Sequence, residues 1–123
     1  MKVKVIHANS RPDEESPRKY GSSWIEYWEN VSLGKKIPEV CPSCGCLMSS
    51  KGGAVGGHIL YENNQNGLVY ITPVCDHCNK QYKGKNRTEH VFEVDESMLV
   101  VGNCDNICEE DCDNIELFIK FCK

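Results

Sequence analysis

The chain lacks any run of 18 or more apolar residues, so no segment is expected to span a membrane. Its beginning, MKVKVIHANS, carries charges within the apolar stretch and has no small-residue cleavage site, which is unlike a secretory signal peptide. Internal repeats, low-complexity segments and linkers are also missing. These absences predict one intracellular, cytoplasmic domain over residues 1–123, with no membrane partner.

An excess of basic residues is missing as well, because 14 Lys and Arg stand against 18 Asp and Glu, giving a net charge of −4. Residues 1–103 are balanced, and the whole acidic excess lies in residues 104–123. Proteins dedicated to nucleic-acid binding usually show a basic excess. The composition therefore argues against tight DNA binding, although it leaves room for a local basic patch.

Cysteine, by contrast, is abundant, with nine residues in 123. The odd number and the absence of an export signal argue against a disulfide framework. Four of the cysteines form two C-x-x-C pairs, Cys41 with Cys44 and Cys75 with Cys78, separated by 30 residues. Zinc prefers four soft ligands at tetrahedral corners, and each pair supplies two thiolates from one turn. We therefore predict a structural Zn²⁺ held by all four thiolates rather than two redox pairs.

A helix is predicted in SSWIEYWENVSLG. Ser23 with Glu26 fits a capping box, and Gly34 stands where a C-terminal stop belongs. Trp24 and Trp28 fall on one face of this helix, which predicts that both pack in the core.

The other elements follow in a recognisable order. A strand over residues 2–7 precedes a polar loop at 8–21, and the first cysteine pair leads into a glycine-rich loop, SSKGGAVGG. A β-hairpin with an Asn66-Gly67 turn then ends at the second cysteine pair, which opens a helix. HVFEV and MLVV read as short strands.

The turn around the first cysteine pair is expected to form a zinc knuckle. A knuckle followed by a β-hairpin and a helix is the treble-clef layout. We expect a small α+β domain built on a zinc-bound treble clef over residues 41–84, with flanking N- and C-terminal helices and short strands.

The residues around these cysteines resemble the HNH nucleases, also called His-Me finger or ββα-metal nucleases, and most closely the recombination endonuclease VII type. The resemblance covers residues 41–84 and includes the four cysteines, a histidine in GGHIL and an asparagine directly after the second pair. It implies that His58 is the general base and that Asn79 binds a divalent cation, Mg²⁺ or Mn²⁺. A neutral imidazole would activate water and the cation would neutralise the scissile phosphate of DNA or RNA.

Two positions depart from that family. Gly57 stands where the family has a metal-binding acid, and VYITPV has no asparagine to orient the histidine. Two functions therefore remain: a divergent member that binds a nucleic acid or a protein, or an active metal-dependent endonuclease. His58 also has a plainer interpretation, as a strand residue whose imidazole bonds the backbone of the glycine loop. No partner for His7 or His90 is evident from the sequence.

A basic run follows the second cysteine pair, formed by Lys80, Lys83, Lys85 and Arg87. It could contact phosphates beside the site, or it could be an ordinary solvated helix end.

The last segment, residues 104–123, shows the pattern of an amphipathic helix. Cys104, Cys108, Cys112 and Cys122 lie on its apolar stripe. Residues eight positions apart on a helix are separated by about 12 Å, which is too far for one ion to bridge. We therefore favour core packing over a second metal site for these four cysteines.

Overall fold

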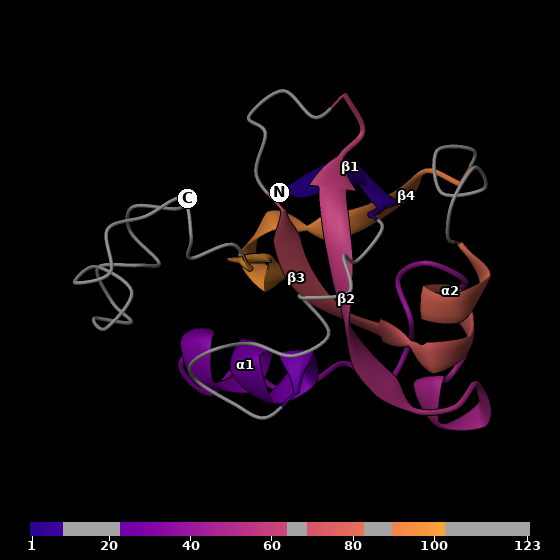
Figure 1. Cartoon of the computed structure of the whole chain (residues 1–123), viewed down its shortest axis with the longest axis horizontal. Helices are drawn as coiled ribbons and strands as arrows, with labels where there is room; N and C mark the ends of the chain where they lie inside the picture. Colours follow the sequence, from indigo (N-terminus) through magenta and orange to yellow (C-terminus); the bar gives the residue numbers. More distant parts are fainter. Residues whose placement is uncertain (9–22, 64–68, 83–89, 103–123) are drawn as a thin grey trace.

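The computed structural model describes residues 1–8, 23–63, 69–82 and 90–102. These residues form a small α+β domain with one five-stranded antiparallel sheet and two α-helices (Figure 1). The strands are β1 (Lys2–His7), β2 (Ala54–Tyr61), β3 (Tyr70–Cys75), β4 (Phe92–Asp95) and β5 (Val100–Val101). The helices are α1 (Trp24–Val31) and α2 (Asp76–Gln81), with 3₁₀ turns η2 (Met48–Ser50) and η4 (Glu96–Met98). Within this described part, each helix is too short to cross a lipid bilayer.

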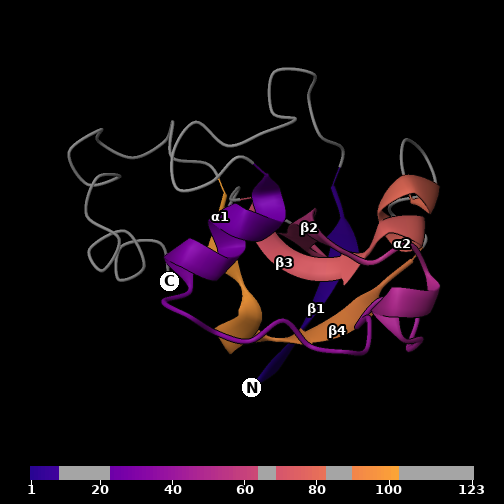
Figure 2. The ribbon, with the colours of Figure 1, turned by 90° about the horizontal axis from the view of Figure 1, so that it is seen from below.

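The strand order in the sheet is β4-β1-β2-β3-β5. Its two edge strands, β4 and β5, are joined by only Glu96–Leu99, part of which is the η4 turn. The edges of a flat five-stranded sheet lie about 19 Å apart. A link that contains a 3₁₀ turn, with a rise of about 2 Å per residue, is too short for that distance. The sheet is therefore strongly curved, and Figure 2 shows α1 and α2 lying apart along it.

Most expected elements are confirmed in the described residues. Strand β1 has the predicted bounds, β2 and β3 form the predicted hairpin, and β4 and β5 lie in the segments assigned to short strands. The Asn66-Gly67 turn, the loop at 9–22 and the helix expected over 104–123 lie outside the described residues.

Helix α1 begins where the capping pattern predicts. Ser23 is its N-cap, and the Ser23 side chain accepts the N–H of Glu26. Gly34, after the helix, has a φ of 85° and donates its N–H to the carbonyl of Glu29, which is how a glycine closes a helix end. Trp28 is fully buried and its indole N–H donates to the Met98 carbonyl, so this tryptophan packs in the core as predicted.

The glycine-rich segment differs from the expectation of a loop, because strand β2 already begins at Ala54. Its glycines make room for neighbours. A Cβ on Gly56 would lie 2.5 Å from the backbone carbon of Trp24, and no side chain approaches so closely. Gly56 therefore allows the start of α1 to lie directly against β2, and composition alone could not distinguish a packing glycine from a loop glycine.

The core lies between the curved sheet and α1 and extends to the cysteine pairs. Its members are buried to at least 94% and come from every strand and both helices: Val5, Tyr27, Trp28, Val31, Cys41, Met48, Ile59, Tyr70, Ile71, Val74, Cys75, Cys78, Phe92, Val94, Leu99, Val100 and Val101.

Candidate metal centre

The first cysteine pair sits in a tight turn closed by backbone hydrogen bonds. Cys41 donates its N–H to the Cys46 carbonyl at 2.9 Å, and Gly45 donates to the Cys41 carbonyl at 2.8 Å. Gly45 has a φ of 76°, a left-handed conformation that glycine adopts without strain. Val40 and Leu47 form an antiparallel bridge at the base of the turn. This local structure turns the thiols of Cys41 and Cys44 toward one side.

The second pair lies at the junction of β3 and α2. Cys75 ends the strand and caps the helix, and its sulfur accepts the N–H of Cys78 at 3.4 Å. Two further backbone bonds hold the segment after η2 against the start of α2: Asp76 donates to the Gly53 carbonyl at 2.9 Å and His77 to the Lys51 carbonyl at 3.1 Å. Figure 1 shows η2 lying directly beside α2, which brings the two pairs together.

The four thiols converge as the spacing predicts. The sulfur atoms of Cys41, Cys44, Cys75 and Cys78 all lie within 4.8 Å of one another, and those of Cys44 and Cys75 are 3.9 Å apart. Four sulfurs at about 2.3 Å from a tetrahedral ion are separated by about 3.8 Å. The donor set therefore fits a thiophilic metal ion.

The sulfurs are also supplied with hydrogen-bond donors. Cys41 Sγ accepts the N–H of Cys75 at 3.3 Å, in addition to the bond from Cys78 to Cys75. Burial raises the pKa of Cys44, but a backbone hydrogen bond from Cys46 and bonds from the other three thiols lower it to about 7. Such donors favour the thiolate form that binds a metal.

For the two thiols of the second pair, the effect of burial outweighs that of the hydrogen bonds. Burial raises the pKa of Cys75 and of Cys78, although Cys78 also has a hydrogen bond with the Ser43 side chain that lowers its pKa. Buried thiolates need a nearby positive charge, and a bound divalent cation supplies it. The cluster therefore has the chemistry of a metal site in which a bound ion would stabilise the thiolate form of its ligands.

His58 lies in the middle of β2 and is only 5% exposed. Its ring packs edge-on against Trp24 of α1, with the ring centroids 4.8 Å apart. Gly56, two residues before it, faces the same helix. His58 therefore points to the side of the sheet that α1 covers.

Asn79 lies near the other face of the same strand. Its side-chain oxygen is 3.7 Å from the point that a Cβ on Gly57 would occupy. Consecutive side chains in a strand point to opposite faces, so Gly57 and His58 face opposite ways. The structure thus brings Asn79 beside position 57 but does not bring it to the face on which His58 lies.

Position 57 itself offers no space for the missing acid. A Cβ there would lie 2.6 Å from Cγ2 of Val74, on the paired strand β3. Of the basic run, Lys80 is described, and its ammonium group pairs with the Asp76 carboxylate at 2.9 Å. Lys83, Lys85 and Arg87 lie outside the described residues, as do Cys104, Cys108, Cys112 and Cys122.

A cluster beside the cysteines was not foreseen. His7 and His90 converge on Ser43, which lies between the ligands of the first pair. Both imidazoles stack on Tyr82, and both lie against Phe92. A serine inside the first C-x-x-C pair was the available signal. His7 lies in β1 and His90 stands two residues before β4. Their meeting depends on the sheet order, which the sequence did not reveal.

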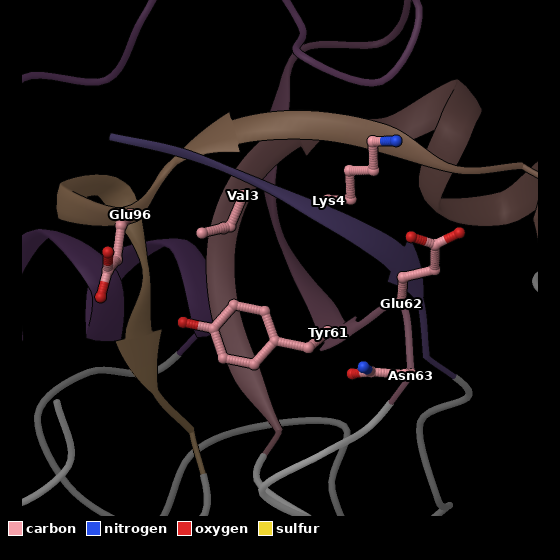
Figure 3. A pocket seen from close by; sticks show the side chains of 6 residues that line it. All are labelled: Val3, Lys4, Tyr61, Glu62, Asn63 and Glu96. Carbon is pink, nitrogen blue, oxygen red and sulfur yellow. The ribbon is translucent and has the colours of Figure 1, made fainter.

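A separate hollow of about 390 Å³ lies between the start of β1 and the end of β2 (Figure 3). It is lined by Val3, Lys4, Tyr61, Glu62, Asn63 and Glu96. None of these six side chains is buried. A site that binds small molecules tightly usually encloses its ligand among apolar walls and a few fixed polar groups. The cysteine cluster is therefore the stronger candidate site.

No protein-family model, no curated protein and no solved structure matches the chain.

Proposed function

We propose that Cys41, Cys44, Cys75 and Cys78 hold one structural zinc ion, and that the protein is a zinc-stabilised module of the HNH-like, treble-clef type without catalytic activity. The observation that carries the proposal is the convergence of four thiols from two distant pairs. Structural zinc sites have four protein ligands, whereas catalytic sites keep one position for water or substrate. Four sulfurs leave no such position.

The proposed role of the ion is to fasten the turn around the first pair to β3 and α2. Helix α2 has only six residues, and the segment from Cys41 to Gly53 contains one short 3₁₀ turn. Segments this short are marginal by themselves, and metal binding supplies folding free energy in such domains. A zinc site of this kind suits an interaction module that must present a fixed surface.

We propose a protein as the partner in preference to DNA or RNA. The net charge of −4 opposes contact with a phosphate backbone. The ammonium group of Lys80 is already paired with Asp76, which further weakens the case for this residue as a phosphate contact.

An active endonuclease is the second candidate, and one observation favours it. Asn79 lies beside position 57, where the HNH nucleases that the sequence resembles carry the acid that binds the catalytic cation. Against it stand the absence of that acid, the lack of space at Gly57 and the burial of His58 under Trp24. A general base must reach the water that it activates.

The two candidates are separated by incubating zinc-loaded protein with plasmid and single-stranded DNA or RNA in Mg²⁺ or Mn²⁺, beside a His58→Ala variant. We expect no cleavage above background by either protein. Cleavage by the wild type that disappears in His58→Ala would replace the interaction module with the nuclease. Zinc content is measured on the same samples, so that an empty site is not mistaken for an inactive one.

A further inference from the structure

Ser43 completes the set of hydrogen-bond donors around the four sulfurs. Three of the sulfurs receive backbone N–H groups. The fourth, that of Cys78, has the Ser43 side chain as its partner instead. A buried thiolate without a donor would be poorly stabilised, so within the described residues this hydroxyl does for Cys78 what backbone N–H groups do for the other three sulfurs.

The Ser43 hydroxyl has more neighbours than it has protons. Its oxygen lies 2.9 Å from Nε2 of His7 and 3.0 Å from Nε2 of His90, in addition to its contact with Cys78. A hydroxyl donates one hydrogen bond and accepts up to two. Ser43 is 6% exposed and His7 is 2% exposed, so these groups must satisfy one another within the protein.

The donor in each hydrogen bond between the imidazoles and the Ser43 hydroxyl can be identified. Nε2 of His90 also lies 2.8 Å from the Ser43 carbonyl oxygen, which can only accept, so this nitrogen carries a proton. If the hydroxyl donates to the Cys78 thiolate, His7 must also present an Nε2–H group to the hydroxyl oxygen. If His7 accepted instead, the only hydroxyl proton would be drawn away from the sulfur.

Aromatic rings pack against both imidazoles. His90 stacks on Tyr82 with centroids 4.2 Å apart and planes within 6°, and His7 lies 4.9 Å from Phe92. Rotation of either imidazole would break these contacts. The rings therefore fix the orientation of the hydroxyl.

We propose that Ser43 is a positioning residue of the metal centre: its hydroxyl donates to the Cys78 thiolate, while His7 and His90 both present Nε2–H to its oxygen. This inference rests on the proposed zinc site. Partners of this outer kind usually change metal affinity about 10- to 100-fold when they are removed.

The first test compares zinc affinity, by competition with a chelator, in the wild type and three serine variants. Ser43→Ala should bind zinc about 10- to 100-fold more weakly, and Ser43→Thr, which keeps the hydroxyl, should recover most of the loss. Ser50→Ala is the matched control, because the Ser50 hydroxyl bonds the Leu47 carbonyl at 2.8 Å on the exposed side of the same segment. It should bind zinc as the wild type does.

Two further readouts separate positioning from general destabilisation. In the cobalt-substituted protein, Ser43→Ala should shift the thiolate-to-cobalt charge-transfer band to lower energy, because the sulfur loses a donor. His7→Phe keeps an aromatic ring and removes the bond to Ser43. It should weaken zinc binding in the wild-type background and have no further effect when combined with Ser43→Ala.

The tautomers can be read in the zinc-loaded wild type without any substitution. Nitrogen NMR of the imidazoles should show a protonated Nε2 in both His7 and His90. An unprotonated Nε2 in His7, or zinc affinity and a cobalt band in Ser43→Ala equal to those of the wild type, would overturn the role of Ser43 while leaving the zinc site intact. A wild-type protein that binds no zinc would instead overturn the proposed function, and this inference with it.

Discussion

The sulfur atoms of Cys44 and Cys75 lie 3.9 Å apart, although 30 residues separate the two cysteines in the chain. That distance is close to the edge of a tetrahedron of thiolates around zinc, which is about 3.8 Å. A metal ion at this point would close a long loop that holds η2, β2 and β3. Closing such a loop restricts the unfolded chain, so the ion should contribute to stability as well as to local geometry.

Substitution of one ligand should remove the ion and lower stability. Cys75→Ser is expected to lose zinc and to reduce the free energy of unfolding by several kcal/mol, because binding of structural zinc supplies on the order of 10 kcal/mol in small zinc domains. The measurements are zinc content and chemical unfolding.

Cys46→Ser is the control for that experiment, since Cys46 is near the turn but outside the group of four thiols. A serine there keeps the backbone bond to Cys44, so zinc content and stability should stay at the wild-type level. Equal loss of zinc in both variants would contradict the assignment of the ligands.

The glycine at position 57 should be required because of the Val74 side chain. Gly57→Ala places a Cβ 2.6 Å from Cγ2 of Val74, and such overpacking typically destabilises by about 1–3 kcal/mol. In a Val74→Ala background the clash disappears, so adding Gly57→Ala should have a much smaller effect. Thermal unfolding of the four proteins measures the coupling, and additive effects would show that the contact does not restrict position 57.

Gly56→Ala provides the contrasting case. Its new Cβ would meet the backbone of Trp24, at 2.5 Å from the carbonyl carbon. Truncation of a side chain cannot relieve a clash with backbone, so this variant should stay destabilised in any Trp24 background. Full rescue of Gly56→Ala by Trp24→Ala would contradict the close approach of α1 to β2.

His7 should make stability depend on pH. Burial, together with repulsion from His90, lowers the pKa of His7 from 6.5 to about 4. The unfolded chain then binds more protons than the folded chain between these values, so stability present above pH 6.5 is lost as the pH falls toward 4. Between pH 7.5 and 5.5 the loss should be about 1.4 kcal/mol.

His7→Phe keeps a ring beside Phe92, Tyr82 and His90 but cannot titrate, so the pH dependence of its stability, and not the stability itself, reports this effect. Between pH 7.5 and 5.5 the unfolding free energy of the wild type should fall by about 1.4 kcal/mol more than that of His7→Phe. Zinc occupancy is measured at both pH values, so that a loss of stability caused by release of the ion is not attributed to His7. Equal pH dependence in the two proteins would show that His7 is not held in its neutral form.

The first turn of α1 offers a smaller test. Ser23→Ala removes the acceptor of the Glu26 N–H and should destabilise the protein by about 1 kcal/mol. Ser32→Ala, at the other end of the helix, removes an exposed bond of 3.2 Å to the Glu29 carbonyl and should have little effect on thermal unfolding. A larger loss in Ser32→Ala than in Ser23→Ala would contradict the role of the cap.

Local signals predicted much of this fold. Alternating apolar residues placed β1, the capping residue Ser23 placed α1, and the C-x-x-C spacing placed the four thiols in one cluster. The signals for β1 and α1 act over a few residues. The C-x-x-C motif occurs twice, and a four-thiolate metal site explains both copies together. That is why they could be read without the fold.

Features that depend on distant neighbours were not predicted. Ala54 to Gly57 looked like part of a loop because the contacts that require Gly56 and Gly57 come from α1 and β3. The meeting of His7, Ser43 and His90 depends on β1 lying between β4 and β2, and strand order does not follow from a single strand's pattern. The relation of His58 to Asn79 likewise depends on which face of β2 each side chain meets.

The most direct test of the zinc centre is metal analysis of the purified protein by native mass spectrometry, with X-ray absorption spectroscopy to identify the ligands. The account predicts one zinc per chain, bound by four sulfur atoms at about 2.3 Å. A chain with no metal and disulfides linking the cysteine pairs would contradict it, and two zinc ions per chain would contradict the assignment of the remaining cysteines to packing.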